Sequence, residues 1–234
     1  MNLDGTFFAL LGIWYIVFLF STVAHEAAHG LAAHIGGDPT AYEGGQVTLD
    51  PVGHIKRSPF GMVFIPILSF LQTGWMMGWA SVPFDSEWGK RHPRRQAVMS
   101  LAGPAANFAL ALIGVIAIKV LLAAGVFDVP YQLGFTQLVR EAGEPRAGSL
   151  VNGLAIALSV LVNLNVLLGF FNLMPIPPLD GAGVAEGLLP SSLGKLYEQM
   201  RQIPILQFVG LLVAWNLFPA RLVLSFVIGL VHSG

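Results

Sequence analysis

The sequence contains no cysteine, and only 11% of its 234 residues are Asp, Glu, Lys or Arg. A soluble domain carries about 25% of these residues, so this chain has too few to cover a water-exposed surface. The missing cysteines exclude disulfides and thiolate metal ligands. The near balance of 12 cations and 13 acids excludes a basic face for nucleic acid. Hydrophobic residues make up 55% of the chain, which indicates an integral membrane protein.

Four apolar stretches are long enough to cross a bilayer, which requires about 20 residues. They cover residues 6–35, 97–127, 150–173 and 204–231. A fifth stretch, residues 60–79, is interrupted by glycine and proline and is therefore expected to be re-entrant or tilted. Partial alternation of polar and apolar residues predicts a small β-hairpin near residues 44–50, and residues 128–149 are expected to form a solvated loop. The expected fold is an all-α polytopic membrane protein with one domain, residues 1–234, whose core covers residues 6–190.

Two histidines and a glutamate follow one another at the end of the first apolar stretch, as His25-Glu26-Ala27-Ala28-His29. On a helix, His25 and His29 lie one turn apart on the same face, so one metal ion can bind both imidazoles. Glu26 points about 100° away and can reach a metal-bound water without being a ligand. In zinc hydrolases of this pattern, the metal lowers the pKa of that water to about 7 and the carboxylate takes its proton. The alternative is a polar helix end, but ionisable residues in a membrane helix are costly and indicate a functional site.

A catalytic zinc site needs a third protein ligand, and without cysteine the candidates are histidine and carboxylate. His34 points off the face that the histidine pair shares. His54 follows the expected hairpin and either approaches the metal or is an ordinary polar loop residue. Asp180 follows three prolines that end the third apolar stretch, in the sequence NLMPIPPLDG. This aspartate is either presented into a cavity at membrane depth or part of an ordinary helix-end turn, and the residues alone favour neither.

The motifs HEAAH and NLMPIPPLDG together resemble those of the site-2 protease family of intramembrane zinc metalloproteases. Three further segments are similar to the family's pattern, namely residues 44–55, 78–83 and 100–107. The resemblance covers residues 15–190 and implies one zinc ion per chain, bound by His25, His29 and Asp180, with Glu26 as the catalytic base. It also implies that Asn172 contacts the substrate or the oxyanion. Asn107, in the segment SLAGPAAN, either hydrogen-bonds toward the site or joins two helices.

The resemblance implies an intramembrane zinc endopeptidase that cleaves peptide bonds within or next to transmembrane segments, in regulated intramembrane proteolysis. Its expected partners are a transmembrane protein substrate, the lipid bilayer and a regulatory partner, but no nucleic acid. Family members often carry a PDZ or CBS domain, which this sequence lacks, so substrate selection stays open. Two other functions remain as alternatives, a non-proteolytic metal-binding scaffold and a membrane metallohydrolase acting on lipids or non-peptide amides. A transporter is disfavoured because the sequence shows no repeated halves.

The membrane orientation follows from the parity of the crossings. If the histidine pair and Asp180 share a metal, the crossings between them must be even in number. Residues 97–127 and 150–173 supply two, so residues 60–79 must enter and leave on one side. Only Arg140 and Arg146 then lie opposite the metal site, and eight cations lie beside it: Lys56, Arg57, Lys90, Arg91, Arg94, Arg95, Lys195 and Arg201. This bias predicts an outside N-terminus and a cytoplasmic active site, in the cell (inner) membrane.

Overall fold

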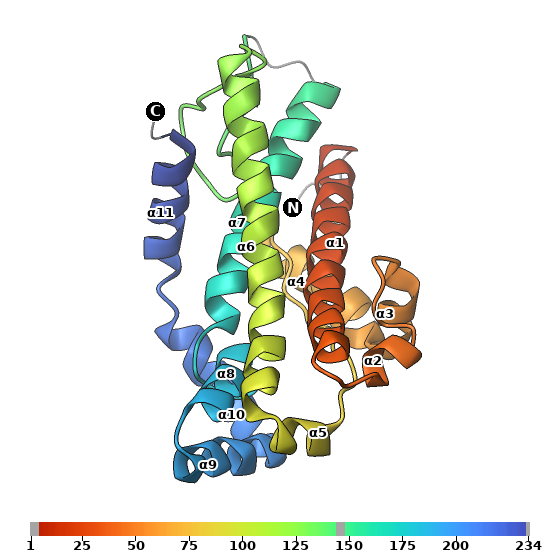
Figure 1. The fold of residues 1–234 in the computed structure, drawn as a ribbon. Helices are drawn as coiled ribbons and strands as arrows, with labels where there is room; N and C mark the ends of the chain where they lie inside the picture. Colours follow the sequence, from red (N-terminus) through yellow and green to blue (C-terminus); the bar gives the residue numbers. More distant parts are fainter. Residues whose placement is uncertain (1–4, 144–147, 233–234) are drawn as a thin grey trace.

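Long apolar helices form the centre of the protein in the computed structural model, which describes residues 5–143 and 148–232 (Figure 1). Three helices are long and apolar enough to cross a membrane: α1 (Gly5–Ile35), α6 (Pro93–Ala123) and α7 (Leu150–Asn172). Two more apolar helices, α10 (Pro204–Leu217) and α11 (Ala220–His232), meet at a 55° bend and are long and apolar enough for a further span when they are taken together. Pro219 lies at this bend, where it cannot donate a helical hydrogen bond. The predicted all-α polytopic fold is confirmed, and the predicted C-terminal stretch consists of two helices joined at a bend.

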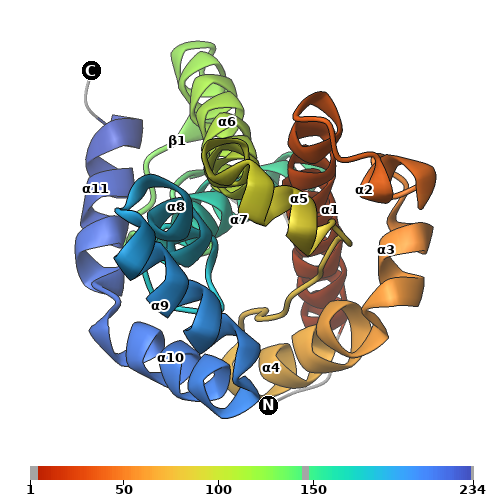
Figure 2. The same ribbon diagram turned by 60° about the horizontal axis from the view of Figure 1, so that its bottom comes forward.

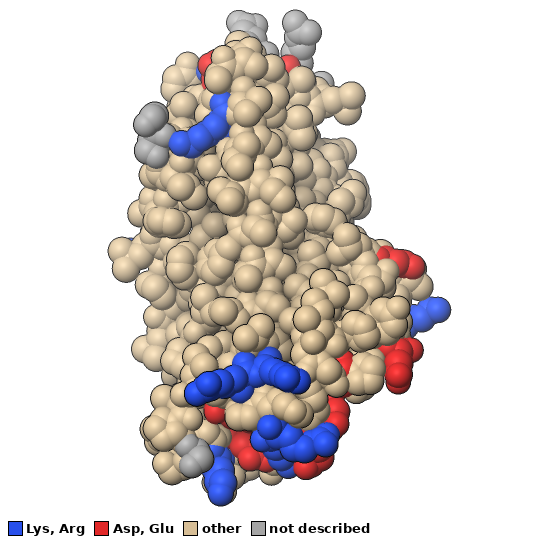
Figure 3. Space-filling model, in the orientation of Figure 1, with Lys and Arg blue, Asp and Glu red and all other residues tan. Residues whose placement is uncertain are grey.

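Shorter helices join the spans, and several of them gather at one end of the molecule (Figure 2). They are α2 (Thr40–Glu43), α3 (Pro51–Arg57), the π-helical turn η1 (Phe60–Phe64), α4 (Ile65–Thr73), α5 (Ser86–Arg91), α8 (Asp180–Leu188) and α9 (Ser191–Gln202). Figure 3 shows Lys and Arg concentrated toward the end that carries α5 and α9, whereas the middle of this face is almost free of charge. An uncharged middle between charged ends is the surface expected of a chain that spans a bilayer.

Residues 60–79 enter and leave the helical bundle on the same side, as parity predicted. α4 ends at Gly74, whose φ of 79° lies in the left-handed region that favours glycine. The chain then returns in an extended conformation, and the Trp79 amide donates to the Gly61 carbonyl over 3.1 Å. On the way in, Phe70 packs against Trp14 of α1, with ring centroids 6.2 Å apart. The segment is therefore re-entrant and does not cross the bundle.

The β-hairpin predicted near residues 44–50 is wrong in its position. These residues form turns, because short polar side chains take up the backbone amides. The Asp50 amide donates to the Thr48 hydroxyl over 3.1 Å, and the Asp50 carboxylate caps the first turn of α3. A two-stranded antiparallel pairing occurs instead between α6 and α7, where β1 (Phe127–Asp128) pairs with β2 (Arg140–Glu141).

The segment between β1 and β2 folds back into the bundle, so the prediction of a solvated loop is wrong for this part. Phe135 stacks on Trp14 of α1 at a centroid distance of 5.4 Å. Its carbonyl accepts a hydrogen bond from the Asn163 side chain of α7 over 2.8 Å. The Leu138 amide donates to the Ser159 hydroxyl over 3.0 Å. Polar groups within α7 thus satisfy a non-helical backbone at the depth of the helices, which is the condition for such backbone inside a membrane protein.

Asp38 connects the end of α1 to the start of α5. Its carboxylate is buried and accepts hydrogen bonds from the amide and the hydroxyl of Thr40 and from the Asp85 amide, at 3.0, 2.5 and 2.8 Å. Burial by itself raises the pKa of Asp38, but these hydrogen bonds outweigh burial and hold the pKa below its ordinary value. The ionised carboxylate therefore stabilises this junction.

Candidate metal centre

Two imidazoles of α1 meet on the face of the helix that packs against α6. The i, i+4 spacing stacks His25 and His29 on one side, and their Nε2 atoms lie 2.9 Å apart. Each histidine is only 7% exposed. The ring planes are nearly perpendicular, at 83°, and the short distance between the Nε2 atoms shows that both rings turn these atoms toward the same place beside the helix.

Asp180 reaches the same point from the other end of the chain. α7 ends at Asn172, and the proline-rich segment after it delivers Asp180 as the first residue of α8. The turn is tight, because a Cβ on Gly181 would overlap the Leu173 carbonyl oxygen. The Asp180 carboxylate oxygens lie 3.1 Å from His25 Nε2 and 3.3 Å from His29 Nε2. One ligand atom from each of the three residues lies within 4.8 Å of the others.

Hydrogen bonds on the outer ring nitrogens assign the tautomers of both histidines. His29 Nδ1 lies 2.7 Å from the Met99 carbonyl, which can only accept, so His29 is the donor. His25 Nδ1 lies 2.6 Å from the Asn107 Oδ1 atom. The Asn107 amide donates to Asn165 Oδ1 over 2.8 Å, which leaves Asn107 Oδ1 to accept from His25. In a neutral imidazole with its proton on Nδ1, the Nε2 atom carries a free lone pair.

The residues present fit a zinc ion. Two Nε2 lone pairs and a carboxylate converge on one point, and these electron-rich atoms repel each other unless a cation lies among them. Asp180 Oδ2 is buried and accepts no hydrogen bond from the described residues. Two imidazoles and one carboxylate form a donor set of catalytic zinc sites, and the hydrogen bonds on Nδ1 fix ring orientation as in such sites.

Glycines set the close approach of the helices that carry these ligands. A Cβ on Gly103 of α6 would lie 2.6 Å from His25 Nε2 and closer still to His29 Nε2. On α8, a Cβ on Gly183 would overlap the Ser100 hydroxyl, and one on Gly187 would overlap the Pro93 carbonyl. Both glycines therefore place α8 directly against α6. The position of Asp180 relative to the histidines depends on these two contacts.

The other residues singled out in the sequence are not members of this group of three. Glu26 is 7% exposed and follows His25 directly on α1. Asn172 is partly buried at the end of α7 and donates to the Leu168 carbonyl over 3.0 Å. His54 is fully buried on α3, where its Nε2 donates to the Thr48 carbonyl over 3.1 Å, and it is not a member of the three-residue group.

Sequence reasoning missed part of the hydrogen-bond network behind the histidines. Asn165 of α7 donates to the Ser21 hydroxyl of α1 over 2.8 Å, so a chain of contacts runs from His25 through Asn107 and Asn165 to Ser21. An asparagine within an apolar run signals such a bond between helices. The Met99 carbonyl on His29 carries no signal in the sequence, because it is a backbone group.

Comparison with known proteins decides the family. A model of peptidase family M50 matches residues 13–217. The chain belongs to peptidase family M50. The resemblance to site-2 proteases is thereby confirmed, and membership in this family of zinc metalloproteases implies zinc as the metal.

Two curated proteins that are similar to this chain carry names that agree with the family. "Putative zinc metalloprotease YwhC" of Bacillus subtilis (strain 168) is 29% identical over 206 residues, which cover 88% of this chain and 82% of the relative. "Putative zinc metalloprotease Rip2" of Mycolicibacterium smegmatis (strain ATCC 700084 / mc(2)155) is 29% identical over 209 residues, covering 89% of this chain and 68% of the relative. No solved structure matches the chain at a significant level.

Proposed function

We propose that this M50 peptidase is an intramembrane zinc endopeptidase that cleaves peptide bonds within or next to transmembrane segments of membrane proteins. In this proposal, His25, His29 and Asp180 hold one zinc ion per chain. The observation that carries the proposal is the convergence of the Asp180 carboxylate, at the start of the short helix α8, with two imidazoles of α1, a helix of membrane-spanning length. Such a location suits a substrate that is itself embedded in the bilayer, and we include a role in regulated proteolysis with a regulatory partner.

In this proposal, each residue of the site has a separate role in peptide hydrolysis. When bound, zinc polarises the scissile carbonyl and lowers the pKa of water. Glu26 accepts the proton that the attacking water loses and passes it to the amine nitrogen as the peptide C–N bond breaks. Asn107 and the Met99 carbonyl act as positioning groups, because they hold both imidazoles with Nε2 toward Asp180. Asn172 contacts the substrate or the oxyanion from the end of α7.

The proposed orientation places the metal site on the cytoplasmic side of the cell (inner) membrane and the N-terminus outside. It is supported by the Lys and Arg residues that gather toward the end with α5 and α9 (Figure 3). On the other side, Arg140 is half-buried and pairs with Asp128 over 3.6 Å. Arg146, the second cation expected there, lies outside the described residues.

Zinc content and peptide cleavage test this function together. The purified wild type is expected to contain about one zinc per chain and to cleave single-span membrane substrates, with the cleavage site mapped by mass spectrometry. Glu26→Gln is expected to keep zinc and lose cleavage, because the amide accepts no proton at neutral pH. His25→Ala and Asp180→Ala are expected to lose zinc.

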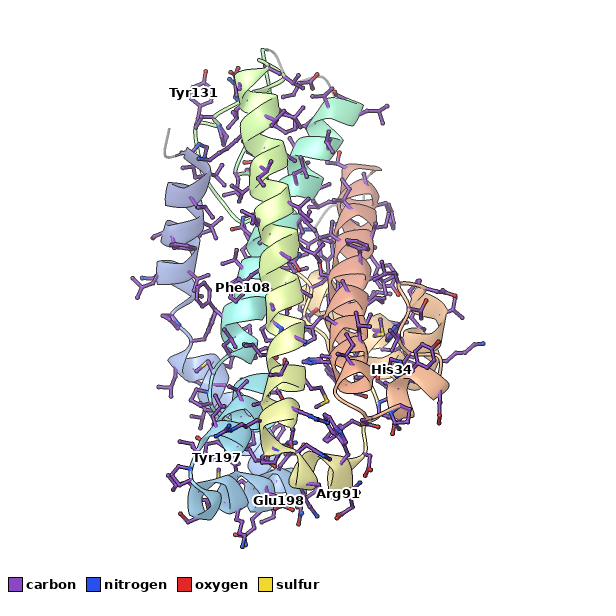
Figure 4. The ribbon with its side chains drawn as sticks, in the orientation of Figure 1. His34, Arg91, Phe108, Tyr131, Tyr197 and Glu198 are labelled. Carbon is purple, nitrogen blue, oxygen red and sulfur yellow. The ribbon has the colours of Figure 1, made fainter. Side chains whose placement is uncertain are left out.

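A matched control is His34→Ala on the same helix. His34 lies near the end of α1 beside α2 and stacks on Tyr42 at 4.2 Å, away from the group of three ligands (Figure 4). This variant is expected to keep both zinc and cleavage. Cleavage by Glu26→Gln would refute the assigned base, and full zinc content in His25→Ala would refute the ligand set. A wild type with zinc that cleaves lipid esters or small amides but no peptide would overturn the proposed substrate class.

A further inference from the structure

A cavity of about 430 Å³ lies among α1, α4, α7, α11 and the segment after β1. Most of its walls are apolar or aromatic, and they include Trp14, Trp75, Phe135, Leu167 and Leu224. Trp14 precedes His25 by eleven residues, which is about 16 Å along a helix. The cavity is therefore separate from the metal centre and serves no step of the proposed hydrolysis.

The charged residue in the lining of this cavity is Arg221, in the first turn of α11. It follows the bend at Pro219 and precedes His232, at the end of the span, by eleven residues. About 16 Å of helix thus separates its backbone from the end of α11. With α10 and α11 taken as one span, this places Arg221 near the middle of a hydrocarbon core about 30 Å thick. Arg221 is exposed at the surface of the described residues, so it is open to a ligand that enters from the bilayer. A cation at this depth is costly, and an anionic partner lowers that cost.

No carboxylate in residues 5–143 or 148–232 forms an ion pair with Arg221. Arg140 and Arg201, in contrast, pair with Asp128 and Glu186. A second donor without a partner lines the same cavity, because Trp14 is fully buried and its indole N–H meets no acceptor among the described residues. The cavity therefore combines a cation, a free N–H donor and apolar walls.

We propose that this cavity binds a long-chain carboxylate, with the ionised head group on Arg221 and the acyl chain against the aromatic walls. The volume falls in the range of small-molecule sites, about 300–1,000 Å³. A transmembrane helix, about 10 Å wide and 30 Å long, occupies on the order of 2,400 Å³ and does not fit. A diacyl phospholipid brings two acyl chains and a larger head group into the same volume.

Quenching of tryptophan fluorescence tests the proposal, since two of the five tryptophans, Trp14 and Trp75, line the cavity. The full chain is purified in detergent at pH 8 and titrated with dibromostearic acid, with its methyl ester, and with dibrominated phosphatidylglycerol. The acid is expected to quench at an about tenfold lower mole fraction than the ester, because only the acid pairs with Arg221. Arg221→Gln is expected to abolish this preference, and Arg221→Lys to keep most of it.

The control variant is Arg94→Gln, an exposed cation in the first turn of α6 and outside the cavity lining, which is expected to leave the preference unchanged. Equal quenching by acid and ester, or an unchanged preference in Arg221→Gln, would overturn the proposal. Stronger quenching by phosphatidylglycerol than by the acid would show that a phospholipid occupies the cavity instead. The measurement needs neither zinc nor cleavage, so its outcome is independent of the proposed peptidase activity.

Discussion

Replacing Gly103 with alanine is expected to weaken zinc binding more than it weakens the fold. The added Cβ would lie 2.6 Å from His25 Nε2 and from His29 Cε1, whereas real Cβ contacts stay beyond 3.0 Å. His29 Nε2 would lie closer still, so the rings or the helices must shift by more than 0.4 Å. Metal–ligand distances tolerate only about 0.2 Å, so the shift falls on the ligand geometry.

The size of the effect follows from the cost of overpacking. An extra methyl group in a packed interior costs about 1–3 kcal/mol. If this strain acts on the zinc-bound form, zinc affinity falls about 5- to 150-fold. Competition with a chelator of known affinity measures this change, and cleavage is expected to fall with zinc occupancy.

Gly114→Ala is the matched control, since its Cβ would lie 2.6 Å from Val162 Cγ2 on the same helix α6 but away from the histidines. It is expected to lower the melting temperature without changing zinc affinity. Gly153→Ala, with no atom within 4 Å of the added Cβ, reports the effect of an unobstructed alanine. Wild-type zinc affinity in folded Gly103→Ala would refute the view that this glycine sets the ligand geometry.

Further predictions concern the surroundings of the site. Asn107→Leu removes the acceptor for His25 Nδ1 and is expected to lower zinc affinity about 10- to 100-fold. Asn107→Asp keeps an acceptor and is expected to recover part of the affinity. Equal zinc affinities in the two variants would contradict the positioning role of Asn107. Since the folded pKa of Asp38 is lowered, its stabilisation is present above about pH 4 and is lost as pH falls through the folded pKa. Wild type is therefore expected to exceed Asp38→Asn in unfolding free energy by about 2 kcal/mol at pH 7, and a difference that does not shrink in acid would refute this assignment. For topology, the chain without native cysteine allows single substitutions at Tyr131, which is 97% exposed, and at Lys195 of α9. Figure 4 shows Tyr131 at the opposite end of the molecule from Glu198 of the same helix α9. In intact cells, a membrane-impermeant maleimide is expected to label Tyr131→Cys and not Lys195→Cys, and the reverse pattern would invert the proposed orientation.

The spans could be predicted from the sequence because each is a continuous apolar run. Whether a segment can cross a bilayer depends on its length and on its own composition, which the sequence gives directly. α1, α6 and α7 begin and end within four residues of the predicted stretches. The bend in the C-terminal span was missed, although Pro219 marks its position. Residues 44–50 show the limit of short patterns, since the polar side chains of Thr48 and Asp50 bind backbone amides there and no strand forms.

The metal site, like the fold, could be predicted from the sequence only in part. The spacing of His25 and His29 was sufficient to place two imidazoles on one helix face, because helical periodicity is local. Asp180 is 151 residues beyond His29. Its residue type and neighbouring prolines could not decide between a metal ligand and a residue of an ordinary helix-end turn. Its approach depends on α8 packing against α6 through Gly183 and Gly187, which is a contact between distant segments.

By itself, the sequence determined that the chain spans a membrane and that a histidine pair with an adjacent glutamate is available for zinc chemistry. On the condition that Asp180 shares the metal, parity also predicted that residues 60–79 turn back. These features follow from composition, parity and helical period, which are local or additive along the chain. Only the tertiary structure decided the tautomers of the histidines, the clearance at Gly103 and the cavity around Arg221. These depend on distances of a few ångströms between helices, which packing sets and which no local pattern encodes.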